Sequence, residues 1–157
     1  MAEKVNRIRR WMLIGVCAAI AGGFAIREYR LIPEDHGGGR ISVAVAHEQA
    51  VDGRILLVDI RTPREWRASG IGEGAVPLDM RREDFVNALT ELTGGNQAAP
   101  VALICARGVR SARLSNRLIE AGFTNIIDVP EGMLGSAAGP GWVRAGLPVQ
   151  KFDEDAG

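Results

Sequence analysis

A complete strand–turn–helix unit is encoded by residues 101–122, VALICARGVRSARLSNRLIEAG. Its first five letters form an unbroken apolar run of the kind found in strands that are buried on both faces. Apolar residues recur on one face of a predicted helix over residues 110–121, which Gly122 ends. The turn between strand and helix begins at Cys105. This unit predicts one βα repeat with a cysteine at the carboxyl end of its strand.

The same alternation of strand and helix patterns continues on both sides of this unit. Strands are predicted at residues 41–43, 55–60, 75–78 and 123–129, and helices at 44–53, from Thr62 onward, and at 81–93. Residues 130–149 are rich in glycine and are expected to form a loop around Trp142. Strands that alternate with helices indicate an α/β domain, in which a largely parallel sheet carries helices on both faces. Ligands of such sheets bind beyond the carboxyl ends of the strands, where Cys105 is placed.

Length and composition limit the kind of protein. A chain of 157 residues supports one ordinary domain with a core of its own. With 19 basic and 19 acidic side chains and a pI near 6.7, no nucleic acid partner is expected. Two cysteines are too few for a disulfide scaffold, and the sequence contains no histidine-rich cluster. Neither a metal nor another cofactor is expected.

The balanced charge hides a basic leader in front of a mildly acidic domain. Residues 1–25 contain four basic side chains and one acidic side chain, which leaves 15 basic and 18 acidic side chains in the remainder. An uncharged apolar run follows at residues 11–26. As a helix it would span about 24 Å, short of the ~30 Å hydrocarbon core of a bilayer. Residues 1–26 are therefore interpreted as a secretory signal peptide or a membrane anchor, and both alternatives stay open.

The same leader predicts where the protein works. Positive charge before an apolar run stays in the cytoplasm, so the bulk of the chain is expected outside it. The predicted location is periplasmic or extracytoplasmic, with residues 11–26 anchoring the chain in the inner membrane if they are not cleaved. The paired arginines before the run leave general secretion and twin-arginine export both open. Residues 27–40 are interpreted as a linker, and residues 151–157 as an acidic tail.

Cys105 is the candidate nucleophile. A cysteine between a strand and a helix N-terminus faces unpaired backbone N–H groups and the positive end of the helix dipole, and Arg107 and Arg110 add cations. These influences are expected to lower the thiol pKa below its free value of about 8.5 and to populate the thiolate. Gly108 lets the loop turn its N–H groups inward, and Ser111 is expected to cap the helix or to touch the sulfur. The alternative, a buried strand-end residue without chemistry, is disfavoured by these neighbours.

Asp59 and Arg61 form a second candidate group at the end of the strand predicted at residues 55–60. A carboxylate and a guanidinium at this edge of the sheet are able to contact a substrate. More often such a pair is a partly buried ion pair that fixes the following loop, and this structural role is favoured here.

The turn after the apolar strand resembles the active-site loop of single-domain rhodanese-like sulfurtransferases, because residues 105–111 follow the pattern Cys-x-x-Gly-x-Arg-Ser. Three further segments are similar to that family in the right order. Residues 56–66, LLVDIRTPREW, resemble its Asp-x-Arg-x-x-x-Glu-aromatic segment, and residues 74–78, GAVPL, resemble its Gly-Ala-x-x-x-Pro segment. Residues 131–149, which end in AGLPV, resemble its closing pattern.

This resemblance implies a five-stranded, largely parallel α/β domain over residues 41–150. It also implies that Cys105 takes a sulfane sulfur from a small sulfur-containing anion such as thiosulfate and forms a persulfide. The acceptor would be a thiol or a protein cysteine. The residues implied to bind the substrate are Ala106, Arg107, Gly108, Val109 and Arg110. The chain departs from the family pattern at residues 70–75, which lack a histidine, and in an insertion at Leu134–Gly141 that is expected to lie near Cys105.

Two other functions compete with sulfur transfer. Cysteine phosphatases and arsenate reductases need Cys-x5-Arg to wrap a tetrahedral oxyanion, whereas Arg110 follows Cys105 by only five positions. The ring is one residue too small, so no useful phosphatase activity is expected. The other alternative is a non-catalytic or sulfur-carrier rhodanese-like module for protein interaction, tethered at the membrane.

Overall fold

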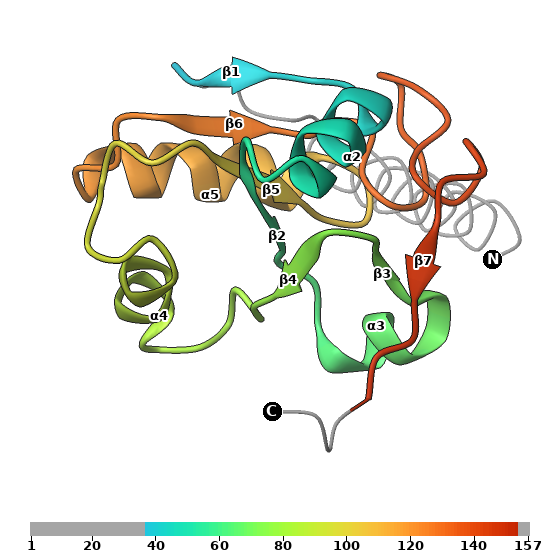
Figure 1. Cartoon of the computed structure of the whole chain (residues 1–157), viewed down its shortest axis with the longest axis horizontal. Coiled ribbons are helices and arrows are strands. Elements are labelled where there is room, and N and C mark those ends of the chain that lie inside the picture. Colours follow the sequence, from blue (N-terminus) through green and yellow to red (C-terminus); the bar gives the residue numbers. More distant parts are fainter. Residues whose placement is uncertain (1–36, 154–157) are drawn as a thin grey trace, which may run out of the picture. The chain divides into compact units, whose positions relative to one another are not determined.

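The computed structural model describes residues 37–153 of the chain (Figure 1). The predicted signal or anchor at residues 1–26, most of the linker and the end of the acidic tail lie outside the described residues. Within the described part, no helix is both long enough and apolar enough to cross a bilayer.

Strands and helices alternate along the described chain, as the sequence predicts. The strands are β1 (Gly39–Arg40), β2 (Leu56–Asp59), β3 (Ile71–Gly72), β4 (Ala75–Pro77), β5 (Val101–Ile104), β6 (Ile126–Asp128) and β7 (Val149–Gln150). The helices are α2 (Val43–Val51), α3 (Pro63–Ser69), α4 (Phe85–Leu92) and α5 (Val109–Glu120).

Five of the strands form one parallel sheet in the spatial order β1-β6-β5-β2-β4. The central strand β5 pairs with β2 on one side and β6 on the other, so that Val101 lies opposite both Leu56 and Ile126. β3 and β7 form a separate antiparallel ladder. The predicted five-stranded parallel α/β fold is confirmed.

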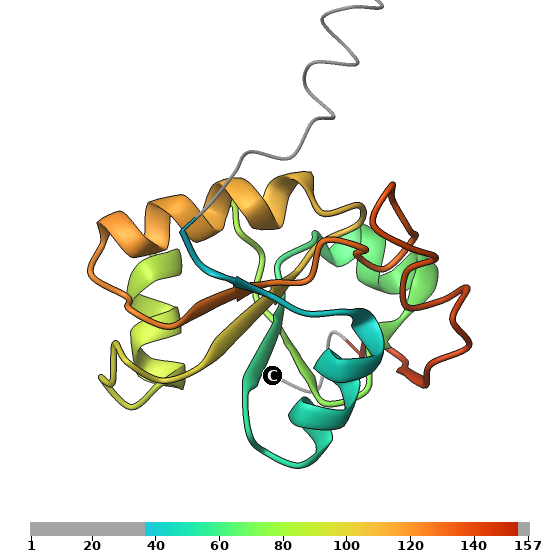
Figure 2. The same cartoon turned by 90° about the horizontal axis from the view of Figure 1, so that it is seen from above.

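Each face of the sheet has its own apolar cluster, because successive side chains along a strand point to opposite faces. On one face, Ala102 and Ile104 belong to the cluster that includes residues of α2 and α3. On the other face, Leu103 and Cys105 belong to the cluster that includes residues of α4 and α5. Figure 2 shows α5 and α2 on opposite sides of the strands. The alternation thus directs the Cys105 side chain toward α5.

One edge of the sheet differs from the prediction. β1 consists of Gly39–Arg40, inside the segment interpreted as a linker, whereas the sequence predicts a strand at residues 41–43. Ser42 is the N-cap of α2 and accepts a hydrogen bond from the backbone N–H of Val45 at 3.3 Å. Because a cap residue starts the helix, the strand has to end before it.

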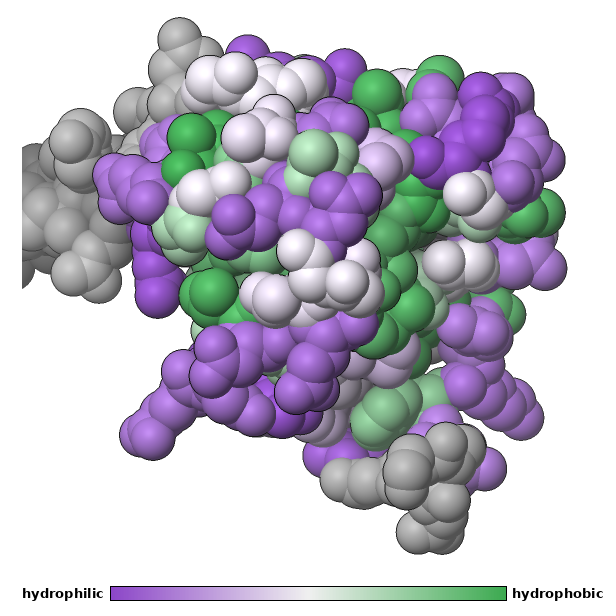
Figure 3. All heavy atoms as spheres, turned by 60° about the vertical axis from the view of Figure 1, so that its left-hand side comes forward, coloured by the Kyte–Doolittle hydropathy of each residue, from purple (hydrophilic) through white to green (hydrophobic). Residues whose placement is uncertain are grey.

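The side of the molecule that carries α4 exposes some hydrophobic side chains between hydrophilic ones (Figure 3). Val86 and Leu92 of α4 are 39% and 43% exposed. Scattered exposure of this kind is ordinary on a soluble domain and marks no binding site by itself.

Candidate active site

Cys105 directly follows β5 and is 1% exposed. Its Sγ accepts a hydrogen bond from the backbone N–H of Gly108 at 3.1 Å. α5 begins at the next residue, Val109, so the sulfur also faces the N-terminal end of a helix. A backbone donor and a helix N-terminus both stabilise negative charge on the sulfur. The loop therefore has the electrostatics that a thiolate or a persulfide anion requires.

Gly108 can have no side chain. Its φ of +83° is in the left-handed region, and a Cβ at this position would lie 2.2 Å from the carbonyl oxygen of Pro130. The loop that follows β6 is thus pressed against the cysteine loop. Two backbone hydrogen bonds join the loops as well: Met133 N–H donates to the Cys105 carbonyl at 2.8 Å, and Leu134 N–H donates to the Ala106 carbonyl at 2.9 Å. The insertion at Leu134–Gly141 begins at this contact.

Ser111 lies at the third position of α5 and does not cap it. Gly108 occupies the N-cap position, and no side-chain hydrogen bond caps this helix. The Ser111 hydroxyl donates to the Gly108 carbonyl at 3.0 Å and lies 3.6 Å from Cys105 Sγ. Of the two roles expected for Ser111, capping is wrong, because Ser111 lies inside α5, three residues after the N-cap Gly108. The contact with the sulfur is present.

Arg110 is held by Glu65, a partner that the sequence analysis did not assign to the site. Arg110 Nη1 donates to Glu65 Oε2 at 3.0 Å and Nη2 to Oε1 at 2.5 Å. Glu65 is the third residue of α3 and forms a capping box with Thr62, which donates to Oε2 through its N–H at 3.0 Å and its hydroxyl at 2.9 Å. The two partners are 34% and 32% exposed.

The pKa values of this pair reflect its geometry. Partial burial raises the pKa of Glu65, but the hydrogen bonds from Arg110 and Thr62 outweigh it and lower that pKa to about 2. The pKa of Arg110 is raised, mainly by its hydrogen bonds to Glu65. Burial lowers this pKa, and the attraction to Cys105 raises it further. Arg110 is therefore a permanent cation close to the sulfur whose position is set by α3.

The other predicted binding residues line the rim of the loop. Ala106 and Val109 are half-buried, and Arg107 is exposed. The turn after β4 adds Arg81, which pairs with Asp79 at 2.6 Å and interacts electrostatically with Arg110. Arg81 was not predicted, because its turn lies far from Cys105 in the sequence. Because Asp79 balances its charge, Arg81 adds an ion pair to the rim and no net positive charge.

Asp59 and Arg61 form a buried ion pair, with exposed fractions of 0% and 1%. Arg61 Nη2 donates to Asp59 Oδ2 at 2.7 Å and to the Gly70 carbonyl at 2.7 Å, and Nη1 donates to Ser69 Oγ at 2.6 Å. The pair thus joins the end of β2 to the end of α3. Residues two apart on a strand share a face of the sheet, so Asp59 lies on the same face as Leu57, which packs with α2 and α3. Cys105 lies on the opposite face. The pair is buried, and its structural role stays a prediction.

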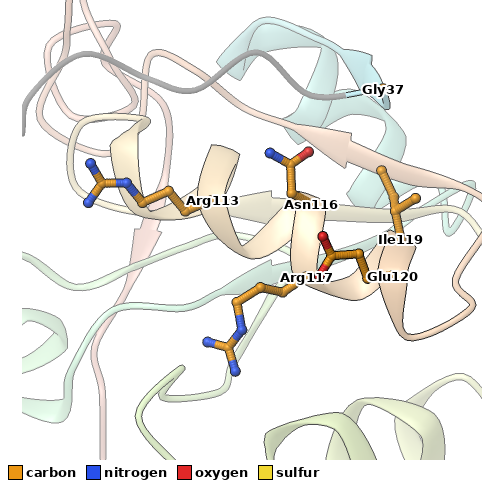
Figure 4. A pocket seen from close by; sticks show the side chains of 6 residues that line it. All are labelled: Gly37, Arg113, Asn116, Arg117, Ile119 and Glu120. Carbon is orange, nitrogen blue, oxygen red and sulfur yellow. The ribbon is translucent and has the colours of Figure 1, made fainter.

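A surface hollow of about 530 Å³ lies along the outer side of α5 (Figure 4). Five α5 residues and Gly37 line it: Arg113, Asn116, Arg117, Ile119 and Glu120. Cys105 and its loop do not contribute to this lining, and no nucleophile is among the lining residues. The hollow is therefore separate from the candidate nucleophile.

The chain belongs to the rhodanese-like family, because residues 42–138 match the family's Rhodanese-like domain. It is 33% identical over 122 residues to a tRNA uridine(34) hydroxylase of Chlamydia abortus, a match that covers 74% of this chain and 36% of that protein. It is also 29% identical over 119 residues to thiosulfate sulfurtransferase 16, chloroplastic, of Arabidopsis thaliana, covering 70% of this chain and 91% of that one. The chain thus spans little more than a third of the hydroxylase.

Solved structures share the fold. The polysulfide-sulfur transferase homodimer of Wolinella succinogenes superposes with a TM-score of 0.56 at 24% identity, over 76% of this chain and 83% of that one. A thiosulfate sulfurtransferase of Pseudomonas aeruginosa superposes with a TM-score of 0.58 at 18% identity, over 74% of this chain and 21% of that one. The chain is accordingly a rhodanese-like protein with sulfurtransferases among its relatives.

Proposed function

We propose that the protein is a sulfurtransferase that carries a sulfane sulfur as a persulfide on Cys105, from an anionic donor such as thiosulfate to a thiol acceptor. The observation that carries this proposal is the hydrogen bond from the Gly108 N–H to Cys105 Sγ at 3.1 Å, beneath the N-terminus of α5. A nucleophilic cysteine needs such a setting. Exposed Arg107 attracts an anionic donor, and Arg110 is held beside the sulfur by Glu65.

The chemistry divides into two displacements. In the first, the Cys105 thiolate attacks the outer sulfur of thiosulfate; a new S–S bond forms, the old one breaks, and sulfite leaves with the electron pair. In the second, the acceptor thiolate attacks the outer sulfur of the persulfide, and Cys105 leaves as a thiolate. No net electrons enter or leave. The Gly108 N–H stabilises the thiolate that starts the first step, and it stabilises the thiolate that leaves in the second step, when negative charge returns to Sγ.

Cyanide-dependent sulfur transfer from thiosulfate tests this proposal. The wild-type chain should release thiocyanate and gain the mass of one sulfur atom when it is incubated with thiosulfate alone. Cys105→Ser should lose both, whereas Cys17→Ser, the matched control at the other cysteine, should keep both. If the wild type neither gains the sulfur nor turns over, the non-catalytic interaction module becomes the better account.

A phosphatase function is disfavoured by the loop. Arg110 follows Cys105 after four intervening residues, and both of its terminal nitrogens bind the Glu65 carboxylate. Turnover of p-nitrophenyl phosphate that is lost in Cys105→Ser would contradict this assignment.

The proposed location is extracytoplasmic, with residues 11–26 as an anchor or as part of a cleaved signal. The support is the basic, then apolar, composition of the leader. Cell fractionation with intact-mass measurement of the recovered chain tests it. A cytoplasmic protein that retains its full leader would contradict the proposal.

A further inference from the structure

Three arginines contribute charge around the cysteine loop, and they differ in what balances that charge. Arg110 donates from both terminal nitrogens to the Glu65 carboxylate, at 3.0 and 2.5 Å. Arg81 is paired with Asp79 at 2.6 Å. Arg107 is exposed, and within the described part of the chain its guanidinium has no ion pair or side-chain hydrogen bond. Of these three cations, Arg107 is therefore the one that no neighbouring carboxylate balances.

The Glu65 carboxylate is held in place before it meets Arg110. Thr62, the N-cap of α3, donates its N–H to Glu65 Oε2 at 3.0 Å and its hydroxyl to the same oxygen at 2.9 Å. Partial burial raises the pKa of Glu65, but the hydrogen bonds from Arg110 and Thr62 lower it to about 2. Glu65 is therefore ionised near neutral pH, and its pair with Arg110 has no net charge.

Arg110 is close enough to the sulfur for this pairing to affect the site. Its pKa is raised mainly by its hydrogen bonds to Glu65 and also by its attraction to Cys105. A donor that brings its outer sulfur to Cys105 therefore brings its anionic group near this pair. A pair without net charge attracts an anion far less than a free guanidinium does. A second negative charge on the donor consequently gains little from Arg110.

We propose that Glu65 is a specificity-determining residue: by pairing with Arg110, it makes the site favour sulfur donors with one negative charge over donors with two. This inference rests on the proposed function. Thiosulfate carries two negative charges, whereas an alkyl thiosulfonate offers the same kind of outer sulfur with a single charge. Glu65 acts through Arg110 and is thus a positioning residue rather than a catalytic one.

The two donors react by the same displacement, so they can be compared directly. The Cys105 thiolate attacks the outer sulfur, and the S–S bond of the donor breaks. Its electron pair leaves with sulfite from thiosulfate, or with methanesulfinate from methanethiosulfonate. Each reaction leaves one persulfide on Cys105. The leaving groups differ, but they differ equally for every variant, so a change in the ratio of the two rates reports the charge around the sulfur.

The rates of persulfide formation with methanethiosulfonate and with thiosulfate, measured on the full-length chain by intact mass, test the inference. Glu65→Gln keeps the shape of the side chain but leaves the charge of Arg110 unbalanced, so the rate ratio should shift about fivefold toward thiosulfate. Arg110→Gln leaves the Glu65 carboxylate unbalanced, so the ratio should shift toward methanethiosulfonate. Both shifts should shrink as salt is added, because the two side chains are partly exposed.

Glu48→Gln is the matched control. Glu48 lies on α2 and forms an exposed pair with Arg54 at 2.6 Å, so the same substitution removes a carboxylate from an arginine elsewhere. This variant should leave the ratio of the two rates unchanged. A purely structural role of Glu65 would slow both donors alike, and it would also leave the ratio unchanged.

The outcomes separate this inference from the proposed function. If the wild type forms no persulfide with either donor, the proposed function fails and the inference fails with it. If the persulfide forms but Glu65→Gln leaves the ratio unchanged, or shifts it in the same direction as Arg110→Gln, the inference alone is overturned. If Glu65→Gln does not fold, Arg110→Gln decides, because an unchanged ratio or a shift toward thiosulfate would overturn the inference.

Discussion

Gly108 contributes to the site around Cys105 in three ways. Its N–H contacts the sulfur, its backbone starts α5, and its missing side chain admits the Pro130 carbonyl. All three contributions depend on the same left-handed backbone conformation, so a substitution at Gly108 affects them together. The sequence predicts that the loop bends at this glycine. It does not predict the contact with Pro130, because the two residues lie in loops that follow different strands, β5 and β6.

Gly108→Ala should therefore lose sulfur transfer and about 3 kcal/mol of unfolding free energy, from backbone strain plus the clash with Pro130. Gly94→Ala is the control: its φ of +60° is also left-handed, but nothing lies within 4 Å of the added Cβ. That variant should lose about 1 kcal/mol and keep its activity. Urea unfolding and thiocyanate release measure both; equal losses in the two variants would contradict the role given to the close contact.

Two charged pairs connect elements around the site. The Glu65–Arg110 pair joins α3 to α5, and the Asp59–Arg61 pair joins the end of β2 to α3. The sequence predicts the Asp59–Arg61 pair, because its members lie two positions apart. It does not predict the Glu65–Arg110 pair, whose members are separated by 45 positions and meet only when α3 and α5 flank the same sheet edge.

The Glu65–Arg110 pair should make stability depend on pH. The pKa of Glu65 is lowered from 4.5 to about 2, so the pair's stabilisation is complete above the unfolded value and is lost as pH falls through the folded value. Glu65→Gln should therefore be destabilised relative to the wild type near neutral pH, and the difference should shrink as pH falls from about 4.5 to about 2. Urea unfolding across this range measures the effect. Glu48→Gln, at an exposed pair with Arg54, should show a much smaller pH-dependent difference.

The Asp59–Arg61 pair should be the more costly of the two to break. Asp59→Asn leaves the Arg61 guanidinium buried without its counter-ion, and a loss of about 3–5 kcal/mol of unfolding free energy is expected. Asp84→Asn, which breaks an exposed pair with Arg82, should leave the urea midpoint nearly unchanged. A loss of unfolding free energy much below this range would contradict the prediction. It would show that solvent, Ser69 and Gly70 stabilise the Arg61 guanidinium without Asp59.

At the scale of the whole molecule, the two apolar clusters draw their members from residues 41–152. The buried strand at residues 101–105 and the alternation around it predict this architecture well, since unbroken apolar runs mark strands covered on both faces. The β3–β7 ladder is missed, and Val149 was expected at the end of a loop, because two-residue strands leave no periodic signal. The stretch after Gly132 likewise has no repeat that would predict its contact with Ala106.

A chain that starts at residue 37 should fold cooperatively and form the Cys105 persulfide as the full-length chain does, because the described core lies within residues 41–152. Urea unfolding and intact-mass measurement after thiosulfate treatment check this. Failure of the shortened chain to unfold cooperatively would show that the leader supplies part of the core.

The edge position of β1 has a mechanical consequence. β1 is paired to β6 through two residue pairs, Gly39 with Ile127 and Arg40 with Asp128, and β6 separates it from β5. Tension applied from the N-terminal side would act first on this short ladder and would separate β1 from β6. The pairing of β5 with β2 would stay intact. Under such tension β1 would detach from β6 before the pairing of β5 with β2 is disturbed, so the loop at Cys105 would keep its structure.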